Sequence, residues 1–113
     1  MKLQDISTAL ALTQHTHQFI DPSREVSSAY CSDMLSCVMT GAAHHSVWVT
    51  LQAHQNIVAV AALLELSAII ITENALPDAA TIEKAEEEGI ILLGTPLKNF
   101  EVCGKLWHLG LRS

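Results

Sequence analysis

The fold is decided by the stretch Val47-Trp48-Val49-Thr50-Leu51-Gln52-Ala53-His54-Gln55-Asn56 and the apolar residues that follow it. Its apolar beginning, residues 47–51, predicts a β-strand, and the polar residues after it predict a turn. A helix is expected over residues 54–65, and the run 67–72 is expected to form a second, buried strand. A strand, a helix and another strand in so short a segment predict two parallel strands joined by a crossover helix.

The remaining segments continue this alternation. Strands are predicted at residues 16–20, 25–31 and 90–93. Helices are predicted at 3–12, at 34–40, between Asp78 and Gly89, and at 96–109, where Thr95 and Pro96 begin the last one. The face that this last helix turns inward is predicted to hold Leu97, Phe100, Cys103 and Leu106. We therefore expect residues 1–113 to form a single small three-layer α/β domain, with a mostly parallel sheet of about four to five strands and flanking helices.

The charge and composition exclude several classes of protein. Six basic and twelve acidic residues give a formal charge of −6, which is opposite to what nucleic acids and acidic membrane surfaces attract. The longest apolar run, residues 57–64, is far shorter than the roughly 20 residues that cross a bilayer, and no signal peptide is visible. Three cysteines without paired spacing do not indicate a disulfide scaffold. We expect a cytoplasmic protein that binds neither nucleic acid nor membrane.

The helix expected at residues 57–64 is apolar on every side. A helix of this kind is usually buried all round, and a domain of 113 residues has little material to cover it. The sequence therefore suggests a homodimer in which this helix lies at the interface. The alternative is that Ala59, Ala61 and Ala62 tolerate contact with water.

Polar side chains follow the predicted strands. Ligands of open α/β sheets bind outside the carboxyl ends of the strands, and the helix N-termini there favour anions. The candidate ligand-binding residues at this edge are Ser32, Asp33, Thr50, Gln52, His54, Asn56 and Thr95. This set suits a small anionic metabolite held mainly by hydrogen bonds. For Ser32, Asp33 and Thr95 the alternative role is helix capping.

Arg24 is the eighth candidate. It is the only arginine before residue 112, and a guanidinium group can hold a phosphate or carboxylate through two hydrogen bonds. A surface ion pair with Glu25 or Asp21 is the alternative.

Other chemistries have weaker support. The sequence contains no glycine-rich phosphate-binding motif, and its histidines and cysteines lack the spacing of zinc or iron–sulfur sites. Asp33, His54 and either Ser32 or Cys31 could meet at the sheet edge as a nucleophilic site, but topology alone suggests this. We predict no enzyme activity, no metal and no cofactor.

Two stretches resemble the DRTGG-domain family, and the resemblance covers nearly the whole chain. The distinctive patterns are Ser32-Asp33-Met34-Leu35-Ser36 and the Thr-Leu-Gln-x-His turn at residues 50–54. The motif that names the family is altered, although Arg24 is kept. Ser23 stands in place of Asp, Ser27 in place of Thr, and Ser28 and Ala29 in place of the two glycines.

The resemblance implies a fold similar to the N-terminal domain of HPr kinase/phosphorylase. It also implies a non-catalytic regulatory module of the kind attached to phosphotransacetylases and CBS-domain pyrophosphatases. Stand-alone members of the family resemble companions of iron hydrogenase systems. The expected function is thus sensing of a phosphorylated or nucleotide-like small molecule, and the alternative is an accessory interaction protein for a hydrogenase or other redox complex. The resemblance carries over no catalytic residue.

Overall fold

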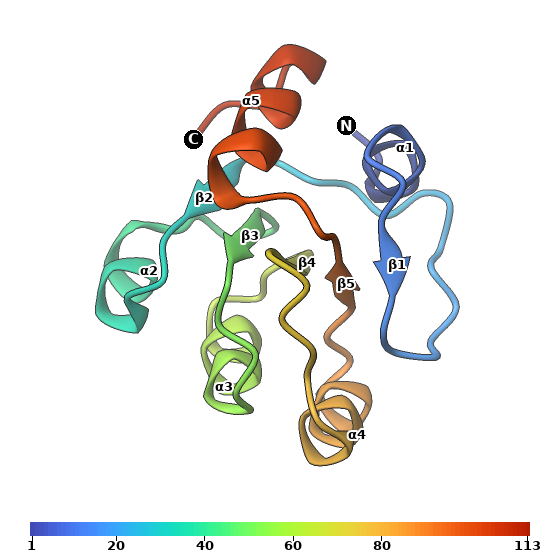
Figure 1. Ribbon diagram of the computed structural model, residues 1–113, viewed down its shortest axis with the longest axis vertical. Helices are drawn as coiled ribbons and strands as arrows, with labels where there is room; N and C mark the ends of the chain where they lie inside the picture. The colour runs from blue at the N-terminus through green and yellow to red at the C-terminus, as the bar shows by residue number, and fades with distance from the viewer.

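The computed structural model describes residues 1–113 and has three layers, a central sheet with helices on both faces (Figure 1). The helices are α1 (Leu3–Ala9), α2 (Leu35–Gly41), α3 (Asn56–Leu63), α4 (Ala79–Glu88) and α5 (Asn99–Leu109). The strands are β1 (Thr13–Gln14), β2 (Ala29–Cys31), β3 (Val47–Thr50), β4 (Ala68–Ile71) and β5 (Leu92–Gly94). The predicted three-layer α/β class is confirmed. None of these helices is both long and apolar enough to cross a bilayer.

The five strands lie in the order β1-β5-β4-β3-β2. Strands β2, β3, β4 and β5 are parallel, and the two-residue β1 adds an antiparallel edge beside β5. In this register Trp48 of β3 lies between Tyr30 of β2 and Ile69 of β4. The carboxyl ends of four parallel strands therefore meet at one edge of the sheet.

Alternate residues of each central strand enter two separate cores. Val47 and Val49 pack on one face with the buried residues of α1 and α5. Trp48, which points the other way, packs with α2, α3 and α4. Every residue of β3 is buried, which explains why the strand reads as an apolar run rather than as an alternating pattern.

The strand predicted at residues 16–20 is wrong. The antiparallel strand is β1, at Thr13–Gln14, and beyond it side chains bond to the β5 segment. The Thr16 hydroxyl accepts the Leu92 N–H at 3.3 Å, and the Gln18 amide donates to the Ile90 carbonyl oxygen at 2.8 Å. One backbone bond continues past β1, from the His15 N–H to the Leu92 carbonyl oxygen at 2.8 Å, and side chains make the contacts after it.

The last helix begins three residues later than predicted, at Asn99. The Thr95 hydroxyl accepts the Leu97 N–H and so forms a turn before the helix instead of capping it. The helix buries Val102 and Leu106, whereas Phe100 is 89% exposed. Residues two apart lie on nearly opposite sides of a helix, so Phe100 cannot face the sheet when Val102 does. The predicted inward position of Phe100 is therefore wrong.

The other helix ends follow the expected chemistry more closely. The Asp78 carboxylate caps α4 by accepting the Thr81 N–H at 2.8 Å, and Gly89 ends the helix with φ +71°. The apolar helix α3 buries Ile57, Val58, Val60 and Ala61 within the chain. Of its other apolar residues, Ala62 is half-buried and Ala59 and Leu63 are exposed.

Candidate functional site

The Asp33 carboxylate is the centre of a hydrogen-bonded cluster at the carboxyl edge of the sheet. Its Oδ1 accepts the Thr50 hydroxyl and the Leu51 N–H, each at 2.8 Å. Thr50 is the last residue of β3 and Asp33 lies between β2 and α2. One carboxylate therefore ties together the ends of two neighbouring parallel strands.

Asn99, the first residue of α5, completes this cluster and was not among the predicted residues. Its side-chain amide donates to Oδ2 of Asp33 at 3.2 Å and more weakly to Oδ1 at 3.4 Å. The side-chain oxygen Oδ1 of Asn99 accepts a hydrogen bond from the hydroxyl of Thr72, which follows β4 and is fully buried. The cluster thus joins segments that follow β2, β3 and β4 to the start of α5. Asn99 was missed because the helix was predicted to begin at residue 96, which placed Asn99 within the helix and not at its start.

Gln52 belongs to the same cluster. The Gln52 side-chain amide donates to the backbone carbonyl oxygen of Asp33 at 3.1 Å, and the backbone N–H of Gln52 donates to the Thr50 hydroxyl. Ser32 is next to the cluster, but its hydroxyl accepts the Met34 N–H at 3.1 Å and its carbonyl oxygen accepts the indole N–H of Trp48 at 2.8 Å. Hydrogen bonds therefore bring together three of the eight predicted residues, namely Asp33, Thr50 and Gln52.

The other three residues predicted for this edge are placed around the cluster. His54 and Asn56 are exposed, and the His54 ring nitrogen Nδ1 accepts the Asn56 N–H at 3.2 Å. His54 also lies near enough to Asp78 to help lower the pKa of that carboxyl, although the Thr81 N–H is the main cause. Thr95 is buried after β5. The His54 side chain bonds to the Asn56 N–H and makes no hydrogen bond with Asp33, so the possible nucleophilic arrangement of Asp33 and His54 is not formed.

Arg24 lies at the opposite edge of the sheet. Its Nε donates to the carbonyl oxygen of Ser67, the residue immediately before β4, at 2.9 Å. The guanidinium makes no ion pair with Asp21 or Glu25, because Asp21 accepts from Ser23 and Glu25 pairs with Lys2. Burial lowers the pKa of Arg24. The structure therefore separates Arg24 from the seven other candidates. Its hydrogen bond to Ser67 instead helps to position the start of β4.

The hollow beside Arg24 is large, about 650 Å³, but it is acidic. Glu65 and Glu88 line it, and α3 and α4 end there. The carboxyl ends of helices carry partial negative charge. Both the acids and the helix ends oppose the binding of an anion in this hollow.

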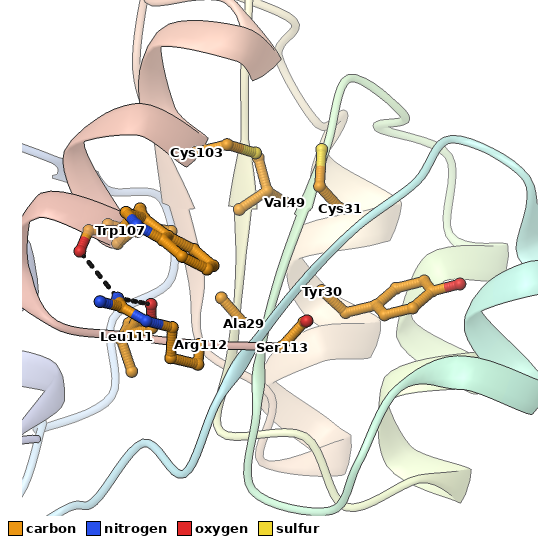
Figure 2. Close-up of a pocket in the computed structure, with 10 residues that line it drawn as sticks. Ala29, Tyr30, Cys31, Val49, Cys103, Trp107, Leu111, Arg112 and Ser113 are labelled. Carbon is orange, nitrogen blue, oxygen red and sulfur yellow. Dashed lines mark hydrogen bonds between the residues drawn. The ribbon is translucent and has the colours of Figure 1, made fainter.

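A second hollow, of about 290 Å³, opens between β2, β3 and α5 (Figure 2). In Figure 2 the sulfur of Cys103 points toward Cys31. The Arg112 guanidinium covers the Trp107 ring at 3.8 Å. Burial, and after it the neighbouring Cys103 thiol, raises the pKa of the Cys31 thiol to about 12. This keeps the thiol protonated and unreactive, and the hollow is mainly apolar.

The structure brings together no group of three or more His, Cys, Asp or Glu side chains that could hold a metal ion. The carboxyl-edge cluster offers hydrogen bonding by one carboxylate, two amides and two hydroxyls.

Comparison with known proteins gives a likeness in structure but none in sequence. No family model and no curated protein matches the sequence. Among solved structures, the chain is similar to the CBS and DRTGG domains of the regulatory region of Clostridium perfringens pyrophosphatase, complexed with its activator diadenosine tetraphosphate. The TM-score is 0.75 at 17% identity, over 93% of this chain and 45% of that one. This chain thus spans less than half of that regulatory region, and the likeness supports a DRTGG-like fold.

Proposed function

We propose that this protein is a non-catalytic regulatory module that senses a phosphorylated or nucleotide-like small molecule at the carboxyl edge of its sheet. The observation that carries the proposal is the cluster of Asp33, Thr50, Gln52 and Asn99, which gathers segments after three parallel strands at one point. Open α/β sheets bind their ligands at this edge. A regulatory region of similar fold is complexed with a nucleotide activator.

The free atoms of the cluster suggest how a nucleotide would be held. The Oδ2 of Asp33 has a single hydrogen-bond partner, Asn99, and the Gln52 side-chain oxygen has none. Both are acceptors, which suits the hydroxyls of a ribose or the amino group of a base. Lys98, exposed immediately before α5, supplies a positive charge for phosphate beside the N-terminus of that helix. The cluster would thus recognise the ligand by hydrogen bonds to its sugar or base, and Lys98 would attract its phosphate.

A thermal-shift titration with AMP, ATP and diadenosine tetraphosphate tests the proposal. A ligand that binds the folded state stabilises it by RT ln(1 + [L]/Kd), about 2.7 kcal/mol at a hundredfold excess over Kd. We expect at least one nucleotide to raise the unfolding temperature, and inorganic phosphate alone to have a smaller effect. Gln52→Ala should remove most of that rise, because it deletes the free acceptor.

Gln4→Ala is the matched control, since Gln4 is exposed on α1, far along the chain from the cluster. Each variant is compared with its own ligand-free unfolding temperature, which separates loss of binding from loss of stability. The proposal fails if none of the three nucleotides shifts the wild type. An unchanged shift in Gln52→Ala would place the ligand elsewhere.

The second candidate function is an accessory interaction protein for an iron hydrogenase or other redox complex. It is favoured by large apolar side chains on loops, where Phe19 is 82% and Leu76 is 73% exposed. Exposed apolar groups of this size are typical of protein contact surfaces when they lie together. Calorimetric titration with a purified iron hydrogenase distinguishes the two functions. Heat of binding that is lost in Leu76→Ser would support the accessory role, and its absence would leave the sensing module.

A further inference from the structure

The outer face of α5 carries an apolar side chain that the fold does not use. Phe100 is 89% exposed, the highest value among the large apolar side chains. Gly104 lies one turn further along the same face, and no atom comes within 4 Å of the position that its Cβ would occupy. A protruding ring and a notch therefore stand side by side on one helix.

The notch opens into a groove between α1 and α5. The groove has a volume of about 430 Å³, and Leu10 and Leu109 contribute apolar surface to it next to Gly104. Figure 1 shows α1 and α5 on the same side of the sheet, with nothing beyond them. A cavity of about 150 Å³ can hold benzene, so this groove has room for a phenyl ring from outside.

We propose that this face of α5 binds the same face of a second copy of the chain, with the two α5 helices antiparallel. Phe100 of each copy enters the groove beside Gly104 of the other. A twofold contact must be self-complementary, and a knob next to a notch meets this requirement. The surface differs from the one expected on α3, and the inference does not rest on the proposed ligand site.

Charge complementarity supports a second copy as the occupant. Glu101 and Lys105 flank the same face, have opposite charges, and form no ion pair within the chain. In an antiparallel pair, Glu101 of each copy lies opposite Lys105 of the other, so two ion pairs form across the interface. This symmetry would not favour an unrelated apolar partner.

The size of the contact indicates a weak dimer. Aromatic side chains bury roughly 150–250 Å² each, so the two Phe100 rings supply roughly 300–500 Å². A stable specific interface buries about 1,200 Å² or more, and the flanking residues must supply the rest. We therefore expect association that depends on protein concentration.

Sedimentation equilibrium over a series of concentrations measures this association. The wild type should pass from monomer mass toward twice that mass as concentration rises. Phe100→Ser should weaken dimerisation by at least about tenfold, as expected for an aromatic residue central to an interface. A wild type that stays monomeric at the highest concentration overturns the proposal.

Two further variants separate the interface from folding. Gly104→Gln fits the monomer and favours the helix, but it fills the notch and should also weaken the dimer about tenfold or more. Leu63→Ser removes a side chain on α3 that is 66% exposed and should leave the dimer unchanged. If the dimer survives Gly104→Gln, or is lost in Leu63→Ser, the interface does not lie on this face of α5.

A charge exchange tests the antiparallel arrangement. Glu101→Lys and Lys105→Glu should each weaken the dimer, because each places like charges opposite one another. The double variant should restore it, since both cross-pairs become attractive again. Circular dichroism confirms that each variant keeps its helices, and a double variant as weak as the singles rules out this pairing.

Discussion

At the scale of single residues, Asp33 does the most to hold the carboxyl edge together. Its carboxylate accepts from Thr50, Leu51 and Asn99. Asp33→Ala removes a charged acceptor and leaves these donors unsatisfied, so we expect the free energy of unfolding to fall by about 2–3 kcal/mol. Urea denaturation measures the change.

Asp5→Ala is the control for Asp33→Ala, because Asp5 is exposed in the first turn of α1. Its effect should stay within about 0.5 kcal/mol. Asn99→Ala should cost less in the Asp33→Ala background than alone, because the two side chains bond to each other. Full additivity would show that the Asp33–Asn99 contact contributes nothing to stability.

Sequence reasoning found Asp33, Thr50 and Gln52 of this cluster and missed Asn99 for a physical reason. Asp33, Thr50 and Gln52 were predicted because polar residues after apolar strands must lie at the carboxyl edge. Asn99 was missed because Thr95 and Pro96 match the pattern of a helix start, which placed Asn99 within the first helical turn. The competing turn, in which Thr95 accepts the Leu97 N–H, depends on the buried position of Thr95 in the fold.

At the scale of elements, two glycines show how the same substitution can have opposite effects. Gly89 ends α4 with φ +71°, a backbone conformation that costs an L-residue energy, and Gly104 lies inside α5. A Cβ has free space at both positions. Gly89→Ala should therefore lower the free energy of unfolding by about 1 kcal/mol, whereas Gly104→Ala should raise it by roughly 0.5–1 kcal/mol.

Urea denaturation at low protein concentration, where the chain is monomeric, measures both glycine variants. The comparison isolates backbone conformation, because neither methyl group gains or loses a contact. Equal signs for the two substitutions would contradict the assignment of Gly89 as a left-handed helix end.

Element types were easier to predict than element faces. The strands β3 and β4 are apolar runs bounded by polar residues, and such runs have one reasonable interpretation. Phe100 was assigned to the inner face of α5 because its spacing from Leu97 and Cys103 fits a helical stripe. The predicted Leu106 is buried, and Leu97 and Cys103 pack partly buried against the core. In place of Phe100 the sheet selects Val102, one turn before Leu106. Helical spacing alone allows several stripes, and packing decides between them.

At the scale of the whole molecule, alternating strands and helices predicted the layers but not the position of every segment. The parallel strands followed from the short connections between them. Arg24 was free in the sequence to lie at either edge, and its bond to Ser67 places it at the amino ends of the strands. This contact links residues about 40 positions apart, and no local sequence pattern predicts contacts of that kind.

Acidic pH should destabilise the folded chain as a whole. Four carboxyls have pKa values below their ordinary range because of hydrogen bonds with partners in the fold: Asp21 with Ser23, Glu25 with Lys2, Asp78 with Thr81, and Glu86 with His17. The folded state therefore binds fewer protons than the unfolded state, and stability rises with pH in this range. The stability that these carboxylates contribute is fully present above the ordinary carboxyl pKa of about 4. It is lost as the pH falls through the lowered pKa values of the folded state.

The urea midpoint measured on both sides of about pH 4 checks this expectation. Asp21, Glu25 and Asp78 are exposed and Glu86 is half-buried, so the loss should be gradual and should shrink at high salt. Glu86→Gln is an informative variant, because it removes the charge and the titration of the carboxylate that His17, beyond β1, contacts at 2.8 Å. Its midpoint should be lower than that of the wild type at neutral pH and should change less on acidification. A wild-type midpoint that stays constant or rises in acid would mean that these contacts do not persist in solution.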